Sequence, residues 1–286
     1  MLVLSLPVID LARKTSPGFK MRSGNPALNE NTFSDLSVYH ADGDSSFRMQ
    51  SADIAAAPAS TMTIRGTAQK TMILLLIAAA SGSITWGKVL NGGQIGLGQA
   101  IPWILAGAAV GLITALIIGF RPKTAPTLAP VYAAAEGLFL GAFSAVFEAR
   151  YPGIVTLAVG LTFGTLAGLL LAYQSGLIRA TENFKLGIAA ATMGICVMYL
   201  ISFIGRWFGF EIPYIHGSGP IGIGVSAFVV VIAALNLVLD FDFIEDASER
   251  GAPKYLEWYG AFALLVTLIW LYMEILRLLA KLNDRK

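Results

Sequence analysis

Five carboxylates are the residues of this chain that could do chemistry, because each lies within or beside a long apolar run. They are Glu136, Asp240, Asp242, Glu257 and Glu274. An ionisable side chain at membrane depth costs at least a few kcal/mol, and it usually faces the interior of a helix bundle or a water-filled cavity. These acids are therefore the candidate residues for ion binding or pH sensing.

Two carboxylates that share a dry site cannot both be ionised cheaply, so the pair shares a proton. The doubly charged pair also offers hard oxygen ligands to a divalent cation such as Ca²⁺. If the apolar runs on either side of residues 245–254 form antiparallel helices, Asp240 and Glu257 lie about 7 and 5 Å below the turn. The pair Asp240 and Glu257 is thus a candidate Ca²⁺ site.

The other acids fit such a pair less well. Glu274 lies about 20 residues beyond the turn, near the opposite membrane face. Asp242 is two positions from Asp240 and points in a different direction on a helix. For each of these acids the alternative is an ordinary place at the membrane interface.

The sequence contains no motif that is typical of a zinc site, a phosphate site or a hydrolase. The one cysteine, Cys196, and two histidines form no zinc-type ligand set, and we find no phosphate loop, nucleophile elbow or paired-histidine motif. We therefore expect neither an enzyme nor a bound cofactor. The net charge is only +2 and no basic stripe is present, so nucleic acid is not an expected partner.

The elements that must position the acids are membrane helices. Only 13% of the residues are charged, about half the usual share in a soluble domain. Pro220–Leu239 is almost wholly apolar and long enough to cross the roughly 30 Å core of a bilayer. Seven such runs occur, at about 71–90, 101–120, 127–147, 153–174, 184–207, 219–243 and 256–280. Unclosed sheets cannot span lipid, so residues 67–286 are predicted to form an all-α, polytopic membrane bundle of seven transmembrane helices.

The residues before the first span form a second region. Residues 22–65 are rich in Ser, Asn, Asp, Ala and Gly, and they show little periodicity. This composition predicts a flexible amino-terminal arm at residues 1–66. Residues 1–20 do not resemble a signal peptide, and we expect Met21 to be the biological start.

Glycines recur at helical spacing in three of the spans, at 107 and 111, at 137 and 141, and at 160, 164 and 168. Small residues on one helix face let neighbouring backbones approach closely. We expect packing within one chain rather than dimerisation.

The distribution of Lys and Arg predicts the orientation in the membrane. With a cytoplasmic amino terminus, the inner side holds Arg65, Lys70, Arg121, Lys123, Arg179, Lys185, Arg250 and Lys254, whereas the outer loops hold Lys88, Arg150 and Arg206. This favours an amino terminus inside. The basic tail Lys281, Arg285 and Lys286 would then be outside, in conflict with the rule.

Three segments resemble a bacterial branch of the Bax inhibitor family, the transmembrane Bax inhibitor motif or YccA-like proteins. They are MRSGNPALNENTF at 21–33, APVYAAAEGLFLGAFSAVFE at 129–148 and NLVLDFDFIEDASERGAPKYLEWYGAF at 236–262. The resemblance covers about 21–286 and implies seven helices with a central last helix. It also implies a multi-pass protein of the bacterial inner membrane.

The resemblance further implies a pH-sensitive Ca²⁺ leak channel or transporter, gated by an acid on each of the last two helices. The family pattern Asp-x-x-x-Ile matches Asp240, and the pattern Leu-Tyr-x-acid matches Glu274, whereas the hairpin geometry favours Glu257. Neither glutamate is the aspartate that the family carries. The expected partners are the lipid bilayer, Ca²⁺ and protons.

The alternative function is that of a membrane interaction protein. It would modulate a membrane protease or a stress response without conducting ions, and it would bind a membrane protein partner through its arm or loops. Ion flux into reconstituted vesicles separates the two functions.

Overall fold

The computed structural model describes residues 61–91, 97–209 and 217–285. Within these ranges it contains seven helices that are long and apolar enough to cross a membrane. They are α2 (Ile64–Asn91), α3 (Leu97–Phe120), α4 (Ala125–Arg150), α5 (Ile154–Gln174), α6 (Glu182–Trp207), α8 (Pro220–Glu249) and α9 (Leu256–Asp284). The seven predicted spans are confirmed, and every helix except α5 extends beyond the apolar run that predicted it at one end or both.

The ends of the helices follow local sequence signals. Pro220 opens α8, a position where its missing N–H costs nothing, and the Thr181 hydroxyl caps α6 by accepting a hydrogen bond from the Phe184 N–H at 3.3 Å. Gly153 and Gly251 have φ of 86° and 64°, a conformation that a glycine adopts without strain, in the turns before α5 and after α8. A short 3-10 turn, η2 (Pro122–Thr124), joins α3 to α4.

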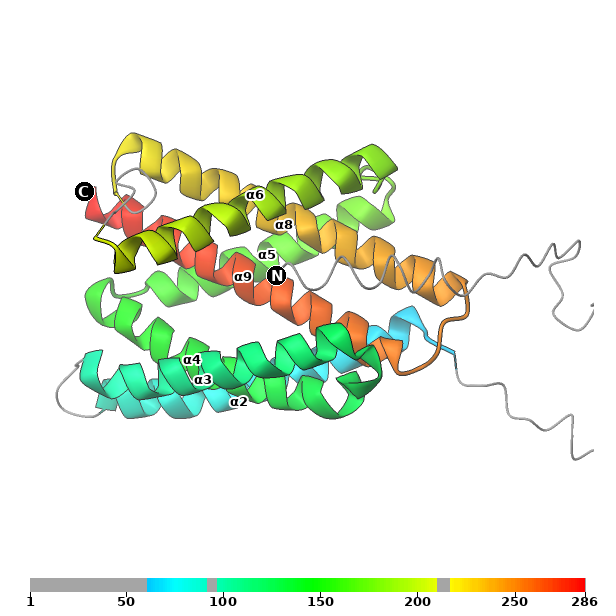
Figure 1. Cartoon of the computed structure of the whole chain (residues 1–286), viewed down its shortest axis with the longest axis horizontal. Helices are drawn as coiled ribbons and strands as arrows, with labels where there is room; N and C mark the ends of the chain where they lie inside the picture. Colours follow the sequence, from blue (N-terminus) through cyan, green and yellow to red (C-terminus); the bar gives the residue numbers. More distant parts are fainter. Residues whose placement is uncertain (1–60, 92–96, 210–216, 286) are drawn as a thin grey trace, which may run out of the picture.

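The last helix is the centre of the bundle. In Figure 1, α9 runs obliquely between α2, α3 and α4 on one side and α6 and α8 on the other. It packs against α2, α4, α5 and α8. Most of its residues are buried, and most of the buried ones are apolar. A helix that is hydrophobic nearly all round belongs in the interior of a bundle, so the predicted central last helix is confirmed.

Glycines let α4 pack tightly between α2 and α3. A side chain at Gly141 would collide with the Gly82 carbonyl and the Thr85 hydroxyl of α2, and one at Gly107 of α3 would collide with the backbone of α4. Packing within the chain is therefore confirmed for these glycines. The three glycines of α5 differ, because a Cβ at Gly160, Gly164 or Gly168 would meet nothing within 4 Å. The expectation of packing within the chain is wrong for that helix.

The boundary between arm and bundle lies earlier than residue 66. Residues 1–60 fall outside the described ranges, so most of the predicted arm cannot be compared. Thr61 forms a β-bridge with Pro253, and the Met62 N–H donates to the Ala252 carbonyl at 2.7 Å. The Met62 side chain is buried, and the Ser248 hydroxyl donates to its carbonyl oxygen. Residues 61–66 thus pack on the bundle, because an apolar methionine finds a pocket beside the α8–α9 turn.

Candidate functional site: the acids of α8 and α9

The bundle has two ends, which we name from the connection between its last two helices. The turn end carries the α8–α9 turn and the start of α2, and the far end carries the end of α9. The candidate acids are distributed between these ends, and each has a different environment.

Asp240 of α8 has no charged partner among the described residues. Among the described residues, its Oδ2 is a buried side-chain oxygen that forms no hydrogen bond, and the Tyr259 hydroxyl of α9 is in the same state. The Thr267 hydroxyl of α9 lies beside the carboxyl, and Tyr259 is close enough to interact with its charge. Buried polar groups are nearly always hydrogen-bonded, so two unpaired oxygens on facing helices make this place the leading candidate site.

Glu257 of α9 is fully partnered. Its carboxylate forms an ion pair with Lys70 of α2 and accepts hydrogen bonds from the Thr63 N–H and hydroxyl at 3.0 and 2.9 Å. Gly66 of α2 makes room for it, since any side chain there would collide with the carboxylate. We call Glu257, Lys70 and Thr63 the turn-end clasp, because they join the first and last helices.

The predicted pair of Asp240 and Glu257 does not form. The depth estimate placed both acids near the turn, but it carried no information on the direction in which each side chain points. Tyr259, two residues after Glu257, faces Asp240, and residues two apart point in different directions on a helix. Glu257 therefore faces α2 while Asp240 faces Tyr259.

Glu274 lies at the far end, as its distance from the turn predicted. The Tyr199 hydroxyl of α6 reaches its two carboxylate oxygens at 3.0 and 3.1 Å, and Arg277 Nη1 donates to it at 2.6 Å. Its side chain is buried. We call Glu274, Arg277 and Tyr199 the far-end clasp. It holds α6 to α9, and it does not contact Asp240.

The far end also contains a buried cation, Lys281, which the sequence analysis had placed in a basic tail. Lys281 Nζ donates to the Gly222 carbonyl at 3.0 Å and to the Ser226 hydroxyl at 2.8 Å, both on α8. Its side chain is only 6% exposed, so it is part of the bundle. Lys281 therefore does not belong to the basic tail whose position outside conflicted with the predicted orientation.

The remaining acids lie apart from this centre. Asp242 forms an ion pair with Lys185 of α6 at 2.7 Å, which confirms that it points away from Asp240. Glu245 accepts a hydrogen bond from the Tyr173 hydroxyl of α5. Glu136 of α4 lies against Gly111 of α3 and forms no ion pair with a described residue.

Sequence reasoning missed the partners of the acids. The spacing of Glu274 and Arg277, three residues apart on one helix, was a readable signal. Nothing in the sequence linked Lys70 to Glu257 or Tyr199 to Glu274, because these pairs come from separate helices.

The described residues hold no ready-made metal site. No three of their His, Cys, Asp and Glu side chains come together in a way that could hold an ion. The predicted Ca²⁺ ligands Asp240 and Glu257 have separate environments.

The comparisons with known proteins place the chain. Searches of curated proteins and of solved structures found no match. The family model described as Bax inhibitor 1 like matches residues 25–284, which include all seven helices and every acid discussed above. The chain therefore belongs to the Bax inhibitor 1 like family.

Proposed function

We propose that this membrane protein lets Ca²⁺ cross the bilayer in a pH-dependent way, with Asp240 as the group whose charge sets the open state. The observation that carries the proposal is the buried carboxyl oxygen of Asp240 that faces α9 without a partner. An intramembrane acid of this kind is costly to keep unless the protein uses it.

The proposed switch needs one acid rather than two. Protonated Asp240 is neutral and compatible with close packing of α8 on α9. Ionised Asp240 is a buried negative charge that faces Tyr259 and Thr267 and no cation. Such a charge is stable only when water or a cation reaches it, so ionisation favours a more open bundle and attracts Ca²⁺.

The ion pairs of the two clasps support different roles for Asp240 and for the two glutamates. Glu257 and Glu274 already have cationic partners, Lys70 and Arg277. Both carboxylates are thus already engaged in charge-assisted hydrogen bonds within the bundle. We therefore assign the glutamates to holding the helices together and Asp240 to the pH response.

The test is Ca²⁺ flux into reconstituted vesicles across a series of pH values. Flux should rise with pH in the wild-type protein, because the ionised form of Asp240 is the open form. Asp240→Asn should flatten this response, because asparagine cannot ionise. Asp242→Asn is the matched control, since that acid is two residues away and paired with Lys185.

Two results would overturn the proposal. If Asp240→Asn keeps a full pH-dependent flux, Asp240 is not the switch. If the wild-type protein carries no Ca²⁺ at any pH while its helices remain folded, the chain is not a channel, and modulation of a membrane protease or stress response becomes the better proposal.

A further inference from the structure

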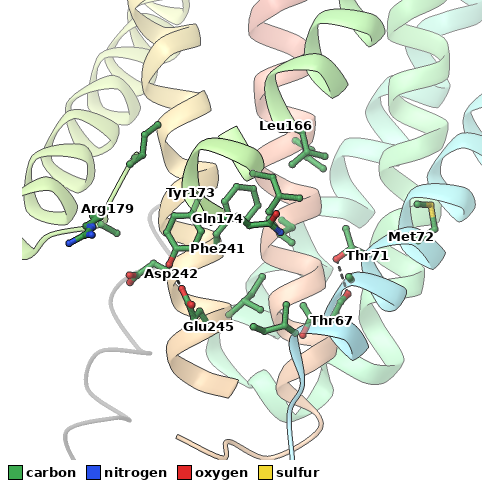
Figure 2. Close-up of a pocket in the computed structure, with 18 of the residues that line it drawn as sticks. Thr67, Thr71, Met72, Leu166, Tyr173, Gln174, Arg179, Phe241, Asp242 and Glu245 are labelled. Atoms are coloured by element: carbon green, nitrogen blue, oxygen red, sulfur yellow. Dashed lines mark hydrogen bonds between the residues drawn. The ribbon is translucent and has the colours of Figure 1, made fainter. Parts of the chain in front are cut away.

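A lateral cavity of about 770 Å³ opens between α2 and α5, and its floor is formed by α8 and α9 (Figure 2). Its volume lies within the roughly 300–1,000 Å³ usual for small-molecule sites. The two helices that form its walls pack on α9 but share few contacts with each other. Both are membrane spans, so the gap between them opens toward lipid.

The cavity is polar at one end and apolar at the other. Its charged residues, Arg179, Asp242 and Glu245, lie where α5 ends and α8 approaches the turn. Its apolar lining, which includes Leu75 and Leu166, lies about 12 Å deeper, given eight residues of helix at 1.5 Å each. This gradient matches that of a phospholipid with its headgroup at the membrane surface.

The charges at the polar end are not all balanced. Asp242 is neutralised by Lys185 at 2.7 Å. Glu245 has a neutral partner, the Tyr173 hydroxyl, so its negative charge is uncompensated. Arg179 is exposed and forms no ion pair with any described residue. The cavity lining thus includes one cation and one anion without ionic partners. Figure 2 shows Glu245 beside Tyr173, whereas Arg179 lies at the outer edge of the polar end.

We propose that this cavity binds one zwitterionic aminophospholipid of the phosphatidylethanolamine type. The Arg179 guanidinium binds the phosphate, because its planar donors match phosphate oxygens. Glu245 binds the primary ammonium, which can donate hydrogen bonds that a trimethylammonium group cannot. One acyl chain lies along Leu75 and Leu166, and the rest of the lipid stays in the bilayer beside exposed Met72 and Leu170.

This site is separate from the proposed switch. Phe241 lines the cavity, whereas the neighbouring Asp240 faces Tyr259 and Thr267 on the other side of α8. A measurement of binding in this cavity therefore does not depend on whether the protein carries Ca²⁺.

The experiment is a lipid titration of the full-length protein in detergent, followed by native mass spectrometry. The probes are phosphatidylethanolamine, phosphatidylcholine and phosphatidylglycerol with identical acyl chains. We expect the wild-type protein to retain phosphatidylethanolamine most strongly. Losing a charge-assisted hydrogen bond usually costs about tenfold or more in affinity, so Arg179→Gln should weaken retention of phosphatidylethanolamine by about tenfold.

Further variants make the test specific. Glu245→Gln should remove the preference for phosphatidylethanolamine over phosphatidylcholine, since the amide still accepts from Tyr173 but carries no charge. Leu166→Trp should displace the lipid by filling the apolar part of the cavity. Arg121→Gln is the matched control, because Arg121 is an exposed arginine outside the cavity. Its lipid retention should equal that of the wild type.

Three results would overturn the inference. Equal retention of phosphatidylglycerol and phosphatidylethanolamine by the wild type would show that the ammonium is not recognised. Unchanged retention in Arg179→Gln would show that the phosphate is not bound there. Unchanged retention in a folded Leu166→Trp, with folding checked by the thermal unfolding midpoint, would place the lipid elsewhere.

Discussion

At the scale of single residues, the two acids near the turn end differ in whether a cation reaches them. The Glu257 carboxylate is 2% exposed and forms an ion pair with Lys70, while the Asp240 carboxyl finds only hydroxyl neighbours. A buried ion pair is weak evidence for stability, but removing one of its partners leaves an uncompensated buried charge. The two acids should therefore respond differently to neutralisation.

The first prediction concerns the turn-end clasp. Glu257→Gln should destabilise the bundle by about 3 kcal/mol, because it removes the negative charge that pairs with the Lys70 ammonium and leaves that ammonium without an anionic partner. Denaturant unfolding in lipid micelles measures the loss. The double variant Lys70→Met with Glu257→Leu should regain most of it. Equal destabilisation in the single and double variants would show that charge pairing is not the cause.

The second prediction concerns the far-end clasp. Tyr199→Phe removes a hydroxyl that reaches both carboxylate oxygens of Glu274 but leaves Arg277 bound to it. It should therefore cost about 1–2 kcal/mol, the usual value for one hydrogen bond to a charged group, and less than Glu274→Gln. The same unfolding assay measures both variants. A larger loss in Tyr199→Phe than in Glu274→Gln would contradict this order.

Part of the site could be predicted from the sequence. Asp240 stood out because an acid so near an apolar run is costly, and the position of Glu274 followed from helix length alone. The partners could not be predicted, because the rotation of each helix about its own axis depends on packing against all of its neighbours. A depth estimate therefore paired Asp240 with Glu257, when Tyr259 is the residue that faces it.

At the scale of elements, the same glycine pattern has two outcomes. Gly137 and Gly141 of α4 lie against the backbone of α2, whereas Gly160, Gly164 and Gly168 of α5 face open space. Regularly spaced glycines show that one face of a helix lacks side chains, but they do not show whether another helix packs on that face. The sequence therefore predicted which helix faces carry only small residues. It predicted that another helix packs on such a face correctly for α3 and α4 but not for α5.

The third prediction uses this contrast. Gly141→Ala should destabilise the bundle by about 1–3 kcal/mol, because its methyl group must push α2 away. Gly164→Ala should be neutral or slightly stabilising, since alanine favours helix and the space is open. Thermal unfolding of the two variants side by side measures the difference. Equal loss in both would mean that the α5 face is also covered in the membrane.

At the scale of the whole molecule, the length of each apolar run was the strongest signal in the sequence. A bilayer requires about 20 apolar residues per span, and seven runs of that length became seven helices. The position of α9 at the centre followed from the family resemblance. The packed segment at residues 61–66 was not predicted, because a single methionine gives no periodic pattern.

The fourth prediction concerns orientation. The β-bridge between Thr61 and Pro253 puts the start of the bundle and the α8–α9 turn at the same end. Reporter fusions at residue 60 and within 245–254 should therefore agree, and the excess of Lys and Arg at that end predicts cytoplasm for both. A fusion in the turn before Ile154 should report the opposite side. A periplasmic signal from residue 60 would reverse the assignment.

The turn-end clasp also has a consequence for the order of events during biosynthesis. Lys70 and Glu257 are 187 positions apart, so at about 5–20 residues per second the lysine waits roughly 10–40 s for its partner to be made. During that interval its long side chain can reach toward the aqueous surface, and α2 can pack on α4 but not yet on α9. A nascent chain that stalls before α9 is made therefore keeps an unpaired lysine near the membrane surface, and the two ends of its sequence remain unjoined at the turn end.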